Sequence, residues 1–382
     1  MKNCIKVLHF STHDEDCGIG KYQEMFLEQF DDIEEIENKF FDYSPNQIRT
    51  MTRDNKIASF QLLEKELERY DILHIQHEFS FYPSDEFKLA CETARKVNKK
   101  LIVTVHTSPS VAFKKAKLHG YGLRSVLHFL RESKANIVFY ENFSNPVKLA
   151  DLILVHNTIT KATLVSLGAQ ASKVQEITIP VPQISHSLKS SEIAAKLNKQ
   201  PGDIIYATTG FLHQFKGVDE AIKALTFLPE NYKLAVIGGM HIDHQHDIYN
   251  RLTDLIRDLH LIDRVYITGY VKEDEHLNSL IRECDICVYP YEKIYYSSVS
   301  SAALNNAFAN FMPVVAYPTA SFKQINNEAY CMSLTQAFSY YELARNINNL
   351  NLEEARDKSK KFAKAYSYPA VAKQIAQIYS NL

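Results

Sequence analysis

The stretch IIYATTGFLHQFKGVDEAIKAL, residues 204–225, decides the fold. Its first six residues are apolar or small without alternation, which is typical of a strand buried on both faces. The chain then turns at Gly210 and takes up helical periodicity over residues 218–225. A buried strand followed by a turn and a helix is one unit of a parallel α/β sheet.

Lys216 and Gly217 stand where this predicted helix begins. The N–H groups and the positive dipole end of a helix N-terminus favour an anion, and a lysine beside them adds a charge that a phosphate would bind. The spacing is not that of a P-loop, because the Lys-Ser/Thr ending is absent. From the residues alone, Lys216 is either a phosphate ligand or a solvated lysine.

The same alternation of short apolar runs and helical stretches extends along the whole chain. Strands are predicted at residues 4–10, 39–43, 71–76, 100–105, 151–156 and 174–179, and again at 204–209, 233–237, 264–268, 285–289 and 313–316. Between the two series, residues 180–203 contain three prolines and a polar stretch, which predicts a linker with a short helix. We therefore expect two doubly wound α/β domains.

Composition limits the class of protein. The chain has 382 residues, of which 46% are hydrophobic and 23% charged, and its formal net charge is -2. These values exclude long disordered tracts and a basic surface for nucleic acid. No apolar run approaches the ~18 residues of a spanning helix, so we expect a cytoplasmic protein that is at most peripheral to the inner face of a membrane.

The cysteines are too few for a disulfide framework, since six occur in the whole chain. Cys284 and Cys287 have the spacing of a redox motif, but they lead into the apolar run 286–289. We interpret them as buried strand residues.

Glycine is scarce, with 11 residues in 382 where about 7% is usual. Seven of them follow the carboxyl ends of predicted strands: Gly18, Gly20, Gly210, Gly217, Gly238, Gly239 and Gly269. Ligands bind at that edge of an open α/β sheet, and glycine lets the backbone approach them closely. A ligand cleft between the domains is the favoured interpretation, and simple strand termination is the alternative.

Taken together, residues 210–225, 233–239, 265–271 and 284–291 resemble the C-terminal half of glycosyltransferase family 4. Residues 17–22, 71–79, 104–107 and 150–157 resemble its N-terminal half, in the family's order. The resemblance implies an α/β protein of GT-B fold, with two facing doubly wound Rossmann-like domains and an interdomain cleft. Its expected parts are an acceptor-side domain at 1–182, a linker at 183–203, a nucleotide-sugar domain at 204–362 and a final helix at 363–382 that crosses back.

The resemblance also implies an activity. Family members are retaining, metal-independent glycosyltransferases that move a sugar from a nucleoside-diphosphate sugar to a glycan or lipid-linked acceptor, as in polysaccharide biosynthesis, without a cofactor. Lys216 matches the lysine on the donor diphosphate, and Gly18 and Gly20 match the loop that closes on the donor. Tyr270 and Val271 match the nucleotide base region. A lysine at a helix N-terminus would stabilise the charge on the departing diphosphate without a metal.

His106 matches the family's residue near the donor sugar and the acceptor hydroxyl. A hydrogen-bonded histidine at a strand end is the alternative for this residue. His77 and Glu78 are candidates to orient an acceptor or a loop, and pairing with each other for structural reasons is the alternative.

The chain departs from the family pattern at the donor site. Aligned on residues 313–316, the two usual glutamates are Ser298 and Asn306, and the usual glycine is Phe311. Phe211 stands where an arginine is common. Ser298, Ser300 and Ser301 could instead donate to a phosphate at the following helix N-terminus. These departures support a second hypothesis, a non-catalytic GT-B subunit that partners an active glycosyltransferase, and a sugar-nucleotide epimerase is a third.

A basic segment runs from Lys114, Lys115 and Lys117 to Lys134, with six Lys/Arg against the single Glu132. Large apolar residues are interleaved, which is typical of a helix at an anionic membrane surface or of a site for an anionic acceptor. Gly120 and Gly122 argue against one continuous helix. A solvated basic face over an ordinary core helix is the alternative.

The C-terminal tail carries apolar residues at Val371, Ile375, Ile378 and Tyr379. Their spacing of i, i+4, i+7 and i+8 predicts an amphipathic helix, and the tail resembles the last helix of GT-B enzymes.

Overall fold

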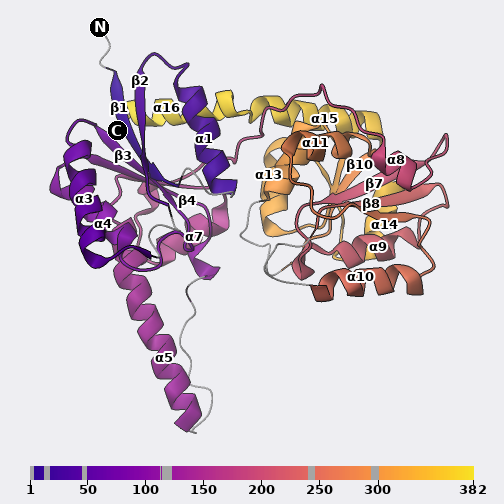
Figure 1. Ribbon diagram of the computed structural model, residues 1–382, viewed down its shortest axis with the longest axis horizontal. Helices are drawn as coiled ribbons and strands as arrows, with labels where there is room; N and C mark the ends of the chain where they lie inside the picture. The colour runs from indigo at the N-terminus through magenta and orange to yellow at the C-terminus, as the bar shows by residue number, and fades with distance from the viewer. Residues whose placement is uncertain are drawn as a thin grey trace. The chain divides into compact units, whose positions relative to one another are not determined.

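The computed structural model describes residues 4–12, 18–44, 50–111, 113, 123–239, 246–293 and 301–382. It divides into two compact units, of which the first comprises Met1–Ile179 with Tyr368–Leu382 and the second Pro180–Ser367 (Figure 1). Each unit contains one six-stranded sheet in which every pair of neighbouring strands is parallel.

The sheet of the first unit has the order β2-β1-β3-β4-β5-β6. Its strands are β1 Ile5–Ser11, β2 Ile36–Asp42, β3 Ile72–His77, β4 Lys100–Val105, β5 Leu152–Val155 and β6 Val174–Glu176. The helices are α1 Gly18–Phe30, α3 Arg53–Leu67, α4 Glu86–Lys96, α5 Leu123–Phe139, α6 Asn145–Val147, α7 Thr158–Ser166 and the C-terminal α16 Tyr368–Ser380. One face of the sheet packs against α1 and α16, and the other against α3 and α4.

The sheet of the second unit has the order β12-β11-β10-β7-β8-β9. Its strands are β7 Ile204–Thr209, β8 Tyr232–Ile237, β9 Val265–Ile267, β10 Ile286–Tyr289, β11 Val314–Ala316 and β12 Ser333–Leu334. The helices are α8 Glu192–Lys196, α9 Val218–Leu225, α10 His246–Asp258, α11 Asp274–Arg282, α12 Ala302–Ala309, α13 Ala320–Ala329, α14 Tyr340–Asn348 and α15 Leu352–Ala365. Helices cover both faces, with α9, α10 and α14 on one and α8, α11 and α12 on the other.

All eleven predicted strands are present, and β12 is the strand that sequence reasoning missed. β12 spans two residues, so it carries too short a run to be recognised. Cys284 and Cys287 are buried with free thiols, as predicted, but only Cys287 lies in a strand, because β10 begins at Ile286. Burial raises the pKa of both.

The predicted linker needs a correction. Residues 183–203 belong to the second unit, and the short helix expected there is α8. Ile193 and Leu197 lie in the core of that unit, and the carboxylate of Glu283 accepts from the backbone N–H groups of Glu192 and Ala194. These contacts attach the segment to the sheet, because they bury its apolar face and satisfy its first N–H groups.

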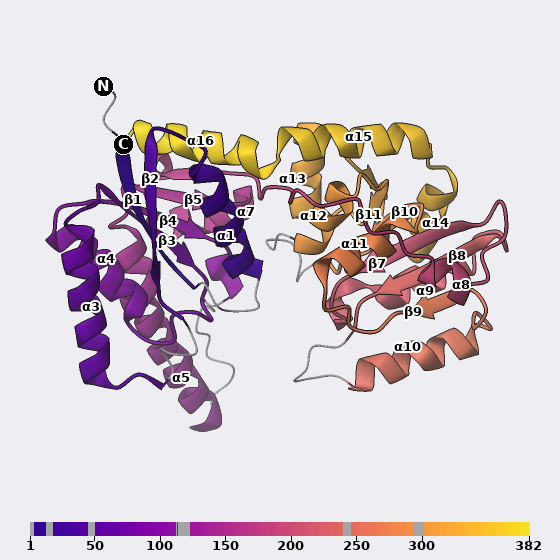
Figure 2. The same ribbon diagram turned by 45° about the horizontal axis from the view of Figure 1, so that its top comes forward.

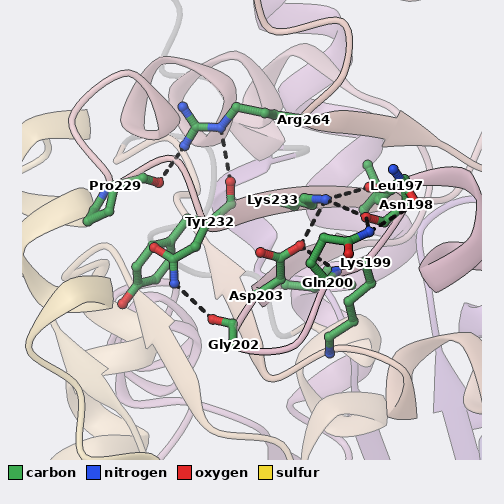
Figure 3. A network of polar contacts seen from close by, with 12 residues as sticks. Leu197, Asn198, Lys199, Gln200, Gly202, Asp203, Pro229, Tyr232, Lys233 and Arg264 are labelled. Carbon is green, nitrogen blue, oxygen red and sulfur yellow. Dashed lines mark hydrogen bonds and ion pairs between the residues drawn. The ribbon is translucent and has the colours of Figure 1, made fainter.

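The edge of the second sheet where β7, β8 and β9 begin is held together by two cations (Figure 3). Nε of Arg264 donates to the carbonyl oxygen of Tyr232 at 3.0 Å, and its Nη2 donates to that of Pro229 at 2.8 Å. Nζ of Lys233 donates to the carbonyl oxygen of Leu197 at 2.6 Å and pairs with Asp203 at 2.9 Å. This network has a structural role, since it lies at the amino ends of the strands.

Helix α5 extends away from the rest of the first unit in both views (Figures 1 and 2). Its exposed large apolar residues are Val126, Leu127, Leu130, Ile137 and Val138, with exposed fractions between 40% and 58%. Its described part begins at Leu123, and the predicted break at Gly120 and Gly122 lies outside the described residues. None of the residues of α5 whose burial is described is buried, so it is not an ordinary core helix. Lys114, Lys115 and Lys117 lie outside the described residues. Among the helices that the structure describes, none has the length and apolar composition needed to cross a bilayer.

Candidate donor site and histidine cluster

Glycine brings several loops of the second unit into backbone contact at the carboxyl edge of its sheet. Gly217 has φ +66°, and a Cβ built on it would lie 2.0 Å from the carbonyl oxygen of Pro290. A Cβ on Gly238 would lie 2.0 Å from the carbonyl oxygen of Gly210, and one on Gly239 would lie 2.2 Å from the backbone nitrogen of Tyr270. The loops after β7, β8, β9 and β10 therefore meet at distances that only glycine allows.

Lys216 lies in this set of loops, at the end of the 3-10 turn Gln214–Lys216 that precedes α9. A Cβ on Gly210 would come within 2.6 Å of its Nζ, and Nζ lies 5.7 Å from the ring centroid of Tyr291. In the described part of the chain its ammonium forms no ion pair, and burial lowers its pKa from 10.5 to about 8. A partly desolvated cation without a carboxylate partner is suited to an anionic ligand.

A layer of hydroxyl groups supports the loop of Lys216. The hydroxyl of Tyr289 donates to the carbonyl oxygen of Ala303 at 2.7 Å and accepts from Thr209 at 3.0 Å. The hydroxyl of Tyr291 lies 2.9 Å from Oγ of Ser301. These contacts join the ends of β7 and β10 to the start of α12 and hold the aromatic ring that faces Lys216.

Helix α12 carries Asn306, one of the two positions where the family has glutamates. Ser301 is its N-cap, and its Oγ accepts from the backbone N–H of Leu304 at 3.3 Å, so it caps the helix as well as contacting Tyr291. Asn306 lies half-buried in the second turn. Ser298 and Ser300 lie outside the described residues. Phe311 has φ +55°, which explains why glycine is usual there, and its ring stacks on His186 at 5.4 Å.

The predicted base region is aromatic and exposed. The rings of Tyr270 and Phe211 stack with centroids 5.7 Å apart and an interplanar angle of 7°. Their exposed fractions are 51% and 44%, so the pair is open to solvent. Val271 instead packs against the core of the unit. Phe211 thus replaces the family's arginine with an aromatic surface.

The first unit has a polar cluster around His106, directly after β4. Nε2 of His106 lies 2.8 Å from Oε1 of Gln76 on β3, and Nδ1 lies 3.2 Å from Nε2 of His156 after β5. The ring of Tyr22 meets that of His106 edge-on at 4.9 Å. Burial lowers the pKa of His106 well below its usual value, so the ring is neutral at physiological pH. His106 is thus a hydrogen-bonded residue at a strand end, and it forms a cluster with Gln76, His156 and Tyr22.

His77 and Glu78 do not pair with each other. His77 is 2% exposed among the rings of Phe79, Tyr82, Phe87 and Phe143, which places it in the core and not on an acceptor surface. Glu78 accepts from the hydroxyl of Thr107 and from the backbone N–H of Phe79. Burial raises the pKa of the Glu78 carboxyl. The two side chains diverge because successive residues of an extended chain point to opposite sides.

Gly18 and Gly20 lie in the first turn of α1 and not in the loop that precedes it. That turn follows β1, so it starts from the same edge of the sheet as His106.

Sequence reasoning missed Gln76 and His156 as partners of His106, and Tyr291 as the ring beside Lys216. One signal was available, since histidines occur at the ends of three successive strands, at His77, His106 and His156. His77 differs in role from the other two because it faces Phe87 and Phe143 on one side of the sheet, whereas His106 and His156 face Tyr22 on the other.

The comparisons with known proteins agree with this architecture. Residues 189–366 match the model of the family described as Glycosyl transferases group 1. Among curated proteins, no sequence matches the chain. The structure is similar to that of Anabaena Alr3699/HepE in complex with UDP, with a TM-score of 0.69 and 15% identity over 99% of this chain and 100% of that one.

Two further solved structures are similar over nearly their whole length. Sucrose-phosphate synthase from Thermosynechococcus elongatus has a TM-score of 0.68 and 16% identity, over 99% of this chain and 98% of that one. A glycosyltransferase from Rickettsia africae has a TM-score of 0.68 and 12% identity, over 99% and 98%. The two parallel sheets and these likenesses show that the chain has the GT-B fold, and residues 189–366 are similar to the family described as Glycosyl transferases group 1.

Proposed function

We propose that the chain is a glycosyltransferase that moves a sugar from a nucleoside-diphosphate donor to an acceptor with retention of configuration and without a metal. The observation that carries the proposal is Lys216, a partly desolvated ammonium without an ion-pair partner in the described residues, held among glycine loops at a helix N-terminus. The match of residues 189–366 to group 1 glycosyl transferases supports the same assignment.

The chemistry follows from the charge that develops when the diphosphate leaves. Breaking the bond between the anomeric carbon and the β-phosphate oxygen builds negative charge on that oxygen. Lys216 and the first N–H groups of α9 would stabilise this charge, and a preorganised donor of this kind contributes about 3–4 kcal/mol to the transition state. The exposed Phe211–Tyr270 pair would offer a stacking surface to the nucleobase.

Calorimetry with UDP, GDP and their sugar conjugates tests the donor site directly. UDP is the first probe, because solved relatives of the same fold contain UDP or UDP-glucose. We expect Lys216→Ala to lower kcat/KM by at least ~100-fold. Lys223→Ala is the matched control, since Lys223 already pairs with Asp219 and Glu220. The proposal fails if no nucleotide binds at millimolar concentration or if Lys216→Ala keeps activity within threefold of wild type.

The rival hypothesis is a non-catalytic partner of another glycosyltransferase. It is supported by Asn306, whose amide cannot supply the negative charge of the family's glutamate. Such a protein would co-purify with a second transferase and would not hydrolyse any sugar nucleotide alone. Nucleotide binding with turnover by the isolated chain would exclude it.

For the acceptor we propose a lipid-linked molecule on an anionic membrane, with α5 as the docking element. Its exposed apolar residues include Leu127 and Leu130, each 56% exposed, and Arg124, Arg131 and Lys134 lie exposed on the same helix. Apolar insertion together with basic residues is the pattern of interfacial helices. Each basic residue near the surface contributes about 1 kcal/mol, so the three together correspond to about 100-fold in partitioning.

Vesicle sedimentation with and without phosphatidylglycerol measures this docking. Arg124→Glu/Arg131→Glu/Lys134→Glu should abolish the preference for anionic vesicles at low salt, and Leu127→Ser/Leu130→Ser should weaken binding to them. Leu62→Ser on α3 is the matched control, because Leu62 is 58% exposed on a helix without this basic pattern. Equal partitioning of wild type and variants would refute membrane docking and favour a soluble glycan acceptor.

A further inference from the structure

A continuous chain of hydrogen bonds runs through the first unit and includes His106. Its ring has a partner on both nitrogens, with His156 at Nδ1 and Gln76 at Nε2. Beyond His156, the chain ends at the carbonyl oxygen of Ile177, 3.1 Å from Nδ1 of His156. Each partner restricts which nitrogen of His106 carries the proton.

The carbonyl oxygen of Ile177 sets the direction of the chain, because it can only accept. Nδ1 of His156 must therefore donate to it. A neutral imidazole has one donor and one acceptor nitrogen, so Nε2 of His156 accepts and Nδ1 of His106 donates to it. Nε2 of His106 is then an acceptor. The Gln76 amide, which is placed with Oε1 toward this atom, must therefore be turned over so that its nitrogen donates there.

The surroundings favour the neutral form of both rings. In the described part of the chain no carboxylate forms a hydrogen bond or an ion pair with either ring, and Tyr22 packs edge-on against both, at 4.9 and 5.9 Å. Burial lowers the pKa of His156 to about 4 and lowers that of His106 as well. The oxygen and nitrogen of a side-chain amide are assigned from their hydrogen-bond partners. Because the rings of His106 and His156 are neutral, their tautomers determine which atom of the Gln76 amide faces His106.

At the other end of this series of hydrogen bonds, donor and acceptor roles can be exchanged. The hydroxyl of Tyr379 on α16 lies 2.6 Å from Nδ1 of His74, and Nε2 of His74 lies 2.8 Å from the hydroxyl of Thr104. The amide of Gln76 lies 3.4 Å from the same Nε2. A hydroxyl can donate or accept. If the loss of the Tyr379 hydroxyl changes the tautomer of His74, the hydroxyl of Thr104 can therefore reverse its role, and the tautomer of His106 stays the same. The position of the proton on His106 is therefore decided by His156, and the Gln76 amide turns to match it.

We propose that His156 and Gln76 are positioning residues with different roles: His156 holds His106 as the tautomer with its proton on Nδ1, and Gln76 donates to the lone pair on Nε2. With Nε2 engaged by Gln76, His106 acts as a fixed dipole and not as a base that takes a proton from the acceptor. The inference rests on the proposed function for the place of His106 in the reaction, whereas the tautomer is a property of the resting protein.

Nitrogen NMR of protein with 15N-labelled histidine tests the inference without any substrate. The signals of His106 are assigned by their loss in His106→Gln. We expect wild type at pH 7 to show a protonated Nδ1 and an unprotonated, hydrogen-bonded Nε2. A protonated Nε2, or an imidazolium, would overturn the assignment without the need for any further variant.

Variants separate the two positioning residues. His156→Phe keeps a ring but removes the acceptor, so the Nδ1 tautomer should lose its dominance and the two forms should become comparable in population. Gln76→Leu should keep the tautomer and shift the Nε2 signal to that of a lone pair without a donor. An unchanged His106 spectrum in either variant would refute the role of that residue.

Tyr379→Phe is the matched control on the same hydrogen-bond chain, because it should change the signals of His74 and leave those of His106 in place. A changed His106 tautomer in this control would show that α16 decides it and would refute the assignment to His156. If transfer is measurable, His156→Phe should lower kcat with little change in the KM for the donor. A protein that binds no nucleotide but shows the Nδ1 tautomer refutes the proposed function and leaves this inference intact.

Discussion

Replacing Lys216 with methionine should make the protein more stable while it weakens donor binding. The variant keeps an unbranched side chain and removes the charge. The fall of the Lys216 pKa from 10.5 to about 8 corresponds to about 3 kcal/mol, at ~1.4 kcal/mol per pH unit. Part of the side chain remains in contact with solvent, so we expect the free energy of unfolding at pH 7 to rise by about 1–2 kcal/mol.

The lowered pKa of Lys216 determines how the stability difference between wild type and Lys216→Met changes with pH. The unfolded chain binds a proton at Lys216 up to about pH 10.5, whereas the folded chain releases it near pH 8. Stability rises with pH wherever the unfolded state binds more protons. The destabilisation by Lys216 is therefore complete below about pH 8 and is lost progressively between about pH 8 and 10.5, so the stability gained in Lys216→Met should shrink as the pH rises through that window.

Urea unfolding of wild type and Lys216→Met at pH 7 and pH 10 measures this difference, because groups common to both proteins cancel. Lys223→Met is the control with the opposite sign, since ion pairs with Asp219 and Glu220 raise the pKa of Lys223. Calorimetry on the same samples should show that UDP affinity falls in Lys216→Met and, in wild type, falls as pH rises above about 8. Equal stability of the two proteins at pH 7 together with unchanged UDP affinity would refute the picture of a desolvated anion-binding lysine.

Two further substitutions test the architecture around the site. Gly217→Ala should destabilise the protein by about 3 kcal/mol in urea unfolding, because its Cβ would overlap the carbonyl oxygen of Pro290. Gly202→Ala, with φ +91° and open space around it, should cost only about 1–2 kcal/mol, and equal losses would show that the close approach is unimportant. Arg264→Ala should cost about 3 kcal/mol through the carbonyl oxygens left unpaired, whereas the exposed Arg257→Ala should change stability by less than about 0.5 kcal/mol; similar small effects would remove Arg264 from the network at that edge.

The strands could be predicted because each is a continuous buried run, and a strand covered on both faces has no polar alternation to obscure it. β12 was missed because two residues carry no periodicity. The linker prediction failed for a related reason. Residues 183–203 contain a proline and several serines, as a connection would, but Ile193 and Leu197 are enough to pack the segment on the second unit.

The glycines and the lysine of the candidate donor site could be identified in the sequence, because they lie within one short stretch. The contacts that require glycine there could not be predicted. Residue 217 must be glycine because the carbonyl oxygen of Pro290 lies where a Cβ would be, and only the folded sheet brings these two residues together. The same holds for Tyr291, which faces Lys216 from another strand end.

The sequence by itself determined the two parallel sheets, the position of Lys216 at a helix start and the presence of histidines at strand ends, since all of these are set by neighbours along the chain. Only the tertiary structure shows which of these histidines is packed among aromatic rings and which is hydrogen-bonded to other side chains. His77 is enclosed by aromatic rings, whereas His106 meets Gln76 and His156 from the two adjacent strands. The physical reason is that a hydrogen bond depends on distance and direction across the sheet, and residues 30 and 50 positions apart acquire these only when the strands pair.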